Sequence, residues 1–411
     1  MRRKISTNDL EINMYVTDLD RPWNQAPFEP PFEFQGFKVS NDDELTRVRK
    51  LCEYVYIDPK FGKEAKNYLP DSYGLKDITQ VFVSLSSSAN SGAFSDETPL
   101  EQEIPMARKV LESANDMYNQ VVIDIQRGNR ISGGDLEQSV SGLVSSINRN
   151  PSALTWLTGQ QGNDSLGYVS PVSITALALT VGRAMRLSID VMESLATATL
   201  FQDIGMLRMP AEIVNKKEPL TREEKDILKG HVDASVKMLG QAGDFPSTVI
   251  QIIQQHHERR DGSGYPRGAA GDDISALAAI SGVSDSYQSA TKDRPHRKGK
   301  TSFQALTELY GDRGNNFEKG VVEQFIQCIG IFPVGSFVEL NTKEVAVVVN
   351  RHPGKQLKPT VRLVVDADGE RIADPPVIDL ANQGGGDGAT RLITRVIDPS
   401  EQNLDVTGIL A

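Results

Sequence analysis

Cysteine is scarce in this sequence, which has Cys52 and Cys328 as its two copies in 411 residues. They fall in different parts of the chain and form no disulfide framework, so the class of small secreted domains stapled by disulfides is excluded. Long apolar runs are also lacking, and none approaches the roughly 18 residues that suggest a membrane-spanning helix. The basic residues at the start are followed by no apolar run and do not form a secretory signal. We therefore expect a cytoplasmic protein without a membrane span.

An excess of positive charge is missing as well. The sequence has 44 Lys and Arg against 55 Asp and Glu, which gives a formal net charge of −11. General nucleic-acid binding needs a basic surface, so we expect no nucleic-acid partner. The 39% of hydrophobic and 24% of charged residues are typical of a globular chain. Its length favours about two or three domains.

The residue pattern divides the chain into segments of different kinds. Residues 1–83 combine short strand patterns with a helix start, which predicts a small α+β domain with a sensing or docking role. Residues 84–103 are rich in Ser, Glu, Asn and Gly and predict a flexible linker. Apolar residues recur at helical spacing through residues 104–330, and β-rich runs separated by turn residues fill residues 331–411. We predict a mainly α protein, preceded by a small α+β domain and followed by a small β-rich extension.

Two of the five histidines, His256 and His257, stand side by side. The apolar spacing of residues 249–253 places the pair at the inner end of an amphipathic helix. The Asp-Gly-Ser-Gly-Tyr-Pro run that follows is a dense turn signal, where the chain must leave the helix. Imidazoles held on a helix beside an exposed loop suit metal binding. The pair by itself is more typical of two core or surface histidines at a helix end than of a metal site.

The longer string that starts at His256, HHE-x-x-DGSGYP-x-G, resembles the signature of the HD-GYP family. This family consists of bacterial metal-dependent phosphodiesterases that hydrolyse cyclic di-GMP. The resemblance extends over roughly residues 130–330, and the N-terminal segment resembles an accessory domain often found ahead of this domain. The resemblance implies an HD-type helical bundle, cyclic di-GMP as the partner, and one or two divalent transition metals, Fe or Mn, as cofactors.

The resemblance also implies a set of metal ligands. The matching residues are an Asp, a later His, the His pair and a late Asp: Asp203, His231, His256, His257 and Asp285. The first four are a complete set for one transition metal, so we expect one tightly held ion. The other interpretation is that these histidines are simply inherited core residues.

The chain departs from the family pattern at three positions. Ser170 stands where the family has an early His, Gln202 replaces the His of a His-Asp pair, and Met206 replaces a Lys. Losing a hydrogen-bond partner of a metal ligand typically weakens metal binding about 10–100-fold. Losing the imidazole ligands themselves should weaken it at least as much. The two-metal arrangement that clamps a phosphodiester is therefore not expected to be intact.

Two functions follow from these matches. The first is a degenerate phosphodiesterase of cyclic di-GMP signalling that acts mainly by binding the ligand or a partner. The second is an active metal-dependent phosphodiesterase in which Gln202 serves as a ligand. The retention of Asp203 and His231 argues against a mere scaffold. By family resemblance, the catalytic roles in an active enzyme fall to Asp203 and Tyr265.

The resemblance extends to substrate and partner contacts. Arg294 and Arg297, in the basic segment 292–300, match positions that resemble substrate-contacting ones, and a guanidinium grips phosphate or a guanine edge. A basic segment of this kind is otherwise an ordinary solvated loop. The loop 264–266 around Tyr265 is similar to surfaces that meet diguanylate cyclase domains, although tyrosine in a tight turn often only packs. A homodimer is a further expectation.

Overall fold

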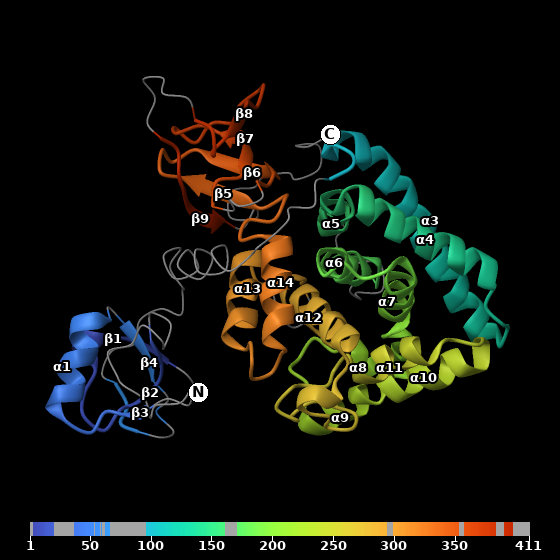
Figure 1. Ribbon diagram of the computed structural model, residues 1–411, viewed down its shortest axis with the longest axis horizontal. Helices are drawn as coiled ribbons and strands as arrows, with labels where there is room; N and C mark the ends of the chain where they lie inside the picture. The colour runs from blue at the N-terminus through green and yellow to red at the C-terminus, as the bar shows by residue number, and fades with distance from the viewer. Residues whose placement is uncertain are drawn as a thin grey trace. The chain divides into compact units, whose positions relative to one another are not determined.

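The computed structural model describes residues 3–19, 37–52, 54–57, 59, 62–65, 96–160, 171–293, 299–352, 357–383 and 390–397. The chain divides into two compact units, Met1–Ser88 and Ala89–Ala411. Figure 1 shows the first unit in blue and the second in colours from cyan to red. The second unit contains both the helical region and the C-terminal sheet.

The first unit is a small sheet with one α-helix among its described residues. The strands run in the order β1-β4-β2-β3, and all described neighbours are antiparallel. Asn41 caps the helix by accepting a hydrogen bond from the Glu44 amide at 2.9 Å, and the acidic first turn favours the same helix end. The elements are β1 (Arg3–Ser6), η1 (Thr7–Asp9), β2 (Tyr15–Leu19), β3 (Phe37–Lys38), α1 (Asp42–Leu51) and β4 (Tyr54–Ile57). The predicted α+β domain is confirmed in its described part.

The second unit begins with a helical region. It consists of α3 (Leu100–Arg127), α4 (Gly133–Arg149), α5 (Pro151–Gln160), α6 (Pro171–Ala184), α7 (Ile189–Phe201), η3 (Ile204–Arg208), α8 (Ala211–Val214), α9 (Arg222–Lys229), α10 (His231–Ala242), α11 (Ser247–Gln255), η4 (Gly271–Asp273), α12 (Ala276–Thr291), α13 (Ser302–Gly311) and α14 (Lys319–Ile329). The prediction of a mainly α protein is confirmed. No described helix is both long enough and apolar enough to cross a membrane.

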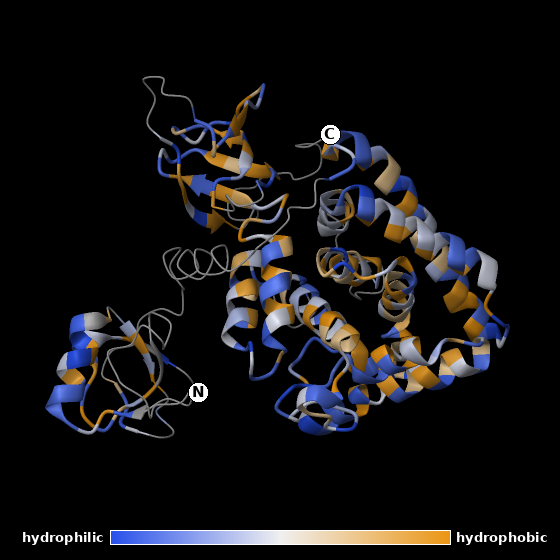
Figure 2. Ribbon diagram, viewed as in Figure 1, coloured by the Kyte–Doolittle hydropathy of each residue, from blue (hydrophilic) through white to orange (hydrophobic). Residues whose placement is uncertain are grey.

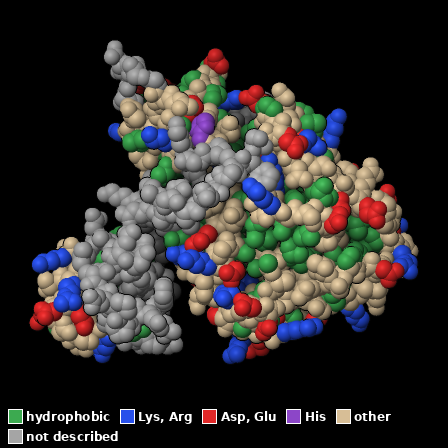
Figure 3. All heavy atoms as spheres, viewed as in Figure 1, with side chains coloured by type: hydrophobic (Ala, Val, Ile, Leu, Met, Phe, Trp, Pro, Cys, Tyr) green, Lys and Arg blue, Asp and Glu red, His purple; other side chains and the backbone are tan. Residues whose placement is uncertain are grey.

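Helix α6 is the centre of the helical region. All of its residues from Val172 to Arg183 are buried, and a helix covered on every side belongs inside a core. It packs against α4, α5, α7, α12 and α14, which surround it in Figure 1. Figure 2 shows the outer helices α3 and α4 with apolar and polar residues on different faces. On the face seen in Figure 3, acidic and basic described side chains are interspersed over the helical region.

The C-terminal sheet packs on the end of the helical region. Its strands run antiparallel in the order β8-β7-β6-β5-β9, with a core that includes Phe337, Val347 and Ile397. Arg351 joins the sheet to the helices by donating hydrogen bonds to the Cys328 carbonyl and to Ser152 Oγ. The strands are β5 (Phe337–Leu340), β6 (Val345–Asn350), β7 (Thr360–Val365), β8 (Val377–Asp379) and β9 (Ile393–Ile397). The β-rich extension is confirmed.

An ion pair with a buried carboxylate holds the first two helices of the bundle together. Helix α3 begins at Leu100, four residues before the start predicted at residue 104. The apolar pattern did not predict this first turn because the residue that the turn buries is the charged Glu103. The fully buried Glu103 carboxylate accepts two hydrogen bonds from Arg149 and one from Ser146, each 2.8 Å long. Glu103 also raises the pKa of Arg149.

Replacing Glu103 by Ala should lower the free energy of unfolding by about 3 kcal/mol, because it leaves a partly buried guanidinium without its partner. Asp244→Ala is the matched control, since it breaks an ion pair with Arg130 in which both side chains are exposed. That control should leave stability unchanged within error. Urea unfolding followed by circular dichroism measures both effects. Equal results for the two variants would contradict this view of the pair.

Candidate metal centre

Four predicted ligands converge although they come from separate parts of the chain. Asp203 follows α7, His231 begins α10, and His256 and His257 follow α11. One ligand atom from each of the four residues lies within 4.8 Å of every other. The structure therefore brings together the set that the sequence analysis assigned to one metal ion, in a geometry consistent with a divalent ion.

The hydrogen bonds of two imidazoles aim their other nitrogens at the centre. The Leu228 carbonyl accepts from His231 Nδ1, and the Ile253 carbonyl accepts from His256 Nδ1, each at 2.7 Å. Because a carbonyl can only accept, Nδ1 carries a hydrogen, and in the neutral ring Nε2 is the nitrogen that presents a lone pair. Metal-binding histidines commonly have this arrangement, in which the outer hydrogen bond fixes the tautomer and the ring orientation.

These two lone pairs have no hydrogen-bond partner and face a carboxylate. Both Nε2 atoms are buried and unsatisfied. Asp203 Oδ1 lies 3.2 Å from His231 Nε2 and 3.7 Å from His256 Nε2. Acceptors at this separation repel each other unless a cation or a proton lies between them. The residues present therefore fit a metal ion.

The pKa shifts keep Asp203 and His257 in their metal-binding forms at neutral pH. Burial alone would raise the pKa of Asp203, but contacts with His231 and His256 hold it well below its usual range. Burial and the neighbouring His256 lower the pKa of His257 far below its usual range, so His257 is neutral. For His231, burial opposes protonation but Asp203 outweighs it and raises the pKa. His231 is thus a ligand that must lose a proton when a metal binds.

Gly205 lets the Asp203 segment lie directly against the start of α10. A Cβ atom on Gly205 would be 2.1 Å from the His231 carbonyl oxygen, so no larger residue fits without a backbone shift. The Gly205 amide donates to Ser235 Oγ at 2.8 Å, and Ser235 Oγ donates to the Gln202 carbonyl at 2.7 Å. Helix α10 therefore holds both sides of Asp203 through Ser235.

The loop after the His pair is tied down by Glu258, for which the sequence analysis gave no role. Its buried carboxylate accepts hydrogen bonds from the amides of Arg267 at 2.8 Å and Ala269 at 2.9 Å. Gly264 is required where the loop crosses back, because its Cβ would lie 2.4 Å from the Arg259 amide nitrogen. An acidic residue shortly before a Gly-rich turn is the sequence signal that points to this anchoring role.

The tied loop places Tyr265 against the metal centre. Its amide donates to the His257 carbonyl at 3.2 Å. The Tyr265 ring stacks on the His257 ring with their centroids 4.6 Å apart, and the Lys229 ammonium lies 5.7 Å from the centre of the Tyr265 ring. Tyr265 is only partly buried. It therefore covers one side of His257 and keeps part of its own surface exposed.

Asp285 and Gln202 lie beside the four-residue cluster. Asp285 is on α12, is 9% exposed, and its Oδ2 lies 3.9 Å from His257 Nδ1. Gln202 is 1% exposed, its side-chain oxygen accepts a hydrogen bond from Ser281, and its Nε2 has no partner. The oxygen that Gln202 would offer to a metal is therefore already engaged.

Several predicted site residues fall where the structure gives less information. Ser170, Arg294 and Arg297 lie outside the described residues. Met206 is in η3, next to the Gly205 contact, and is partly buried. The substrate-contacting roles of the two arginines stay predictions.

Comparisons with known families divide the chain into three parts. A model described as an HD domain matches residues 144–321. A domain of unknown function (DUF3391) matches residues 2–135, and a KOW domain associated with HD domain matches residues 337–404. The candidate metal centre lies within the part that matches the HD domain.

Curated relatives are similar to nearly all or to about a third of this chain. The cyclic di-GMP phosphodiesterase PA4108 of Pseudomonas aeruginosa is homologous to this chain, with 28% identity over 94% of this chain and 91% of that protein. A cyclic di-GMP phosphodiesterase of Thermotoga maritima is 34% identical over 32% of this chain and 36% of that protein. The 3'3'-cGAMP-specific phosphodiesterase 2 of Vibrio cholerae is 29% identical over 33% of this chain and 26% of that protein.

A solved structure is also similar to the chain. It is Bd1817, described as a HDG"Y"P protein from Bdellovibrio bacteriovorus, with 15% sequence identity and a TM-score of 0.44. The match covers 79% of this chain and 98% of that one.

The cluster should bind one divalent transition metal per chain. His256→Ala should lower the metal affinity at least about 100-fold, because it removes a ligand itself rather than a hydrogen-bond partner of a ligand. His352→Ala is the matched control, since His352 pairs with Asp379 in the C-terminal sheet and should leave the metal content unchanged. Elemental analysis after metal-supplemented expression measures both. Two fully occupied ions per chain, or none, would show that the four-residue assignment is wrong.

Metal binding should release a proton from His231 near neutral pH. The pKa of His231 is raised above the usual histidine value of about 6.5, so protonation of His231 stabilises the metal-free fold fully below that pH. This contribution is lost as the pH rises through the raised pKa. Proton release on metal binding should therefore fall toward zero above that value. Calorimetry in buffers of different ionisation enthalpy measures the number of protons released. If that number stays constant from pH about 6 to about 9, His231 is not the group that loses the proton.

Proposed function

The chain carries an HD domain between an N-terminal domain of unknown function and a C-terminal KOW domain, and from this premise we propose that it is a metal-dependent phosphodiesterase acting on cyclic di-GMP. The observation that carries the proposal is the convergence of Asp203, His231, His256 and His257, with two buried and unpartnered Nε2 atoms at the centre. The similarity to PA4108 over nearly the whole of both chains supports this substrate.

The ligand residues and their neighbours have separate tasks in this proposal. Asp203 and the three histidines hold the ion, which when bound lowers the pKa of water and offsets the charge on a phosphodiester. The carbonyls of Leu228 and Ile253 keep the imidazoles in the tautomer that binds. Asp203 serves as a ligand, and its partly exposed carboxylate would orient the attacking water by accepting a hydrogen bond from it.

Tyr265 and Asp285 complete the proposed catalytic environment. Tyr265 lies on the His257 ring and presents its outer side to a substrate. Asp285 adds a carboxylate on the α12 side of His257, and we assign it as a further ligand of the same ion. Arg294 and Arg297 remain our candidates for gripping the substrate phosphates, because a guanidinium binds phosphate through two hydrogen bonds.

A second candidate function is a protein that binds cyclic di-GMP with little hydrolysis. The observation that favours it is the side chain of Gln202, which replaces an imidazole of the family pattern and gives its oxygen to Ser281. A second metal ion would then lack a ligand, and the clamp that two ions form on a phosphodiester would be incomplete. Under this alternative the ligand changes the protein's interactions, as expected for a regulatory role.

A turnover assay separates the two functions. With Fe or Mn, the purified protein should convert cyclic di-GMP to a linear product, and His256→Ala should lower kcat at least about 100-fold, in the range seen when an electrostatic group of an active site is removed. His352→Ala should keep full activity. Installing the imidazole by Gln202→His should raise kcat.

Binding must be measured beside turnover to interpret a negative assay. Calorimetry with cyclic di-GMP on the metal-loaded protein gives the affinity directly. Binding without turnover would replace the phosphodiesterase with the second candidate. Neither binding nor turnover, in a protein that holds its metal, would contradict both.

A further inference from the structure

The helical region and the C-terminal sheet border a cavity of about 400 Å³ within the second unit. Its described lining residues come from α5, α6, α12, α13 and α14, from β5 and β9, and from the loops beside them. None of the four metal-ligand residues is among these described lining residues. The cavity is thus separate from the candidate metal centre, and its volume lies in the range of small-molecule sites.

Two buried donors in the cavity wall have no hydrogen-bond partner. Trp156 is 4% exposed and Gln288 is 6% exposed, and the Nε1 atom of the first and the Nε2 atom of the second are both unsatisfied. Leaving such a donor buried and unpaired costs about 1–3 kcal/mol. An indole N–H and an amide NH₂ can only donate. A molecule that satisfies both must therefore present acceptor atoms.

The charges in the same wall favour an anion. Arg351 is partly buried, and its described hydrogen bonds go to the uncharged oxygens of Cys328 and Ser152. Arg351 and Lys292 are both partly buried, and this reduced hydration lowers the pKa of each. Asp293 is the one acidic residue among the described lining residues, and its carboxylate accepts a hydrogen bond from the Gly299 amide.

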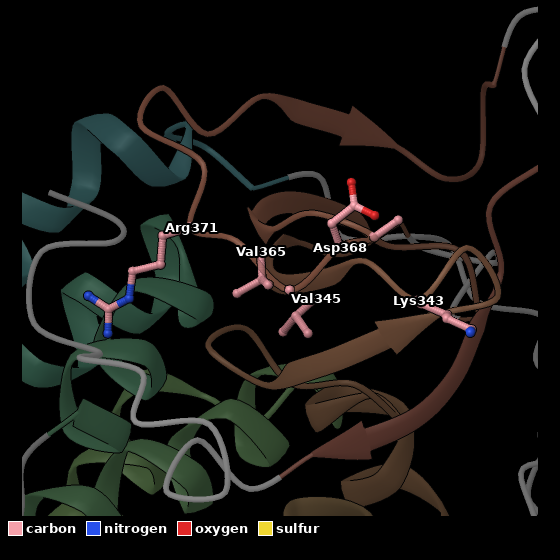
Figure 4. A pocket seen from close by; sticks show the side chains of 7 residues that line it. Lys343, Val345, Val365, Asp368 and Arg371 are labelled. Carbon is pink, nitrogen blue, oxygen red and sulfur yellow. The ribbon is translucent and has the colours of Figure 1, made fainter.

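A second hollow of similar size among the described residues lacks these features. It lies on the C-terminal sheet and is lined by Lys343, Val345, Val365, Asp368 and Arg371, among others. Figure 4 shows Lys343 and Arg371 extending away from each other rather than toward a common point. Its described lining residues include no buried polar atom without a partner. The unsatisfied donors of Trp156 and Gln288 therefore distinguish their cavity from this hollow on the sheet.

We propose that the cavity lined by Trp156, Gln288, Lys292 and Arg351 binds a phosphorylated small molecule of mononucleotide size. A phosphate monoester presents three terminal oxygens and a double negative charge, which matches two neutral donors and two cations. The remaining volume takes the organic part of the ligand. Helix α12 carries both Gln288 and Asp285, one turn apart, so the ligand bridges the sheet to the helix beside the metal centre. This inference does not depend on the proposed phosphodiesterase activity.

The test uses GMP, orthophosphate and succinate as probes on the full chain after its metal has been removed with a chelator. Metal removal prevents phosphate from binding to an ion at the other site. GMP should bind in calorimetry more tightly than orthophosphate, and succinate should bind weakly or not at all. Equal affinities for GMP and orthophosphate would overturn the assigned size, and tight succinate binding would overturn the assigned phosphate.

Two variants connect the binding to the unpartnered donors. Gln288→Leu and Trp156→Phe should each weaken GMP binding about tenfold, because each removes a hydrogen bond to a charged group. Gln251→Leu makes the same change as the first variant on an exposed position of α11 and should leave the affinity unchanged. Without GMP, Gln288→Leu should have a Tm at least equal to that of the unmodified protein, because it removes a buried unsatisfied amide.

The stability readout keeps the result interpretable if a variant folds poorly. In the unmodified protein GMP should raise the Tm, and this rise should shrink in both cavity variants but not in the control. Absence of GMP binding at millimolar concentration would overturn the proposal. Unchanged binding in both cavity variants would do so as well.

Discussion

The repulsion between a carboxylate and two imidazole lone pairs is the constraint on which the centre of this protein depends. Asp203 Oδ1 faces the Nε2 atoms of His231 and His256, and backbone carbonyls fix both rings with these atoms turned inward. Such an arrangement is unfavourable unless positive charge lies between the groups. The bundle can maintain it because the packed helices hold the three segments that carry the ligands.

Backbone contacts, more than side-chain packing, set the precision of the centre. Gly205 allows η3 to approach α10 more closely than any side chain would permit, and Ser235 joins the two segments. Glu258 performs a similar task for the loop that carries Tyr265. Metal sites need supporting groups of this kind, since a misplaced ligand costs affinity as surely as a missing one.

Gln202 lies beside the four candidate ligands but is not one of them. Its carboxamide occupies a buried place next to Asp203 in the chain but is bonded to Ser281, and its amide nitrogen is unsatisfied. The four candidate ligands therefore stand together without Gln202, whose side-chain oxygen is engaged by Ser281. The chain thus combines similarity to a cyclic di-GMP phosphodiesterase with a buried Gln beside the candidate ligand Asp203.

The sequence by itself determined the class of each region and the identity of the candidate ligands. Helical spacing, β-rich runs and the string around His256 and His257 are local patterns, which depend on residues close in the chain. Only the tertiary structure decided which nitrogen of His256 faces Asp203 and that Trp156 and Gln288 share a cavity. These features depend on distances between residues that folding brings together, and no local pattern encodes them.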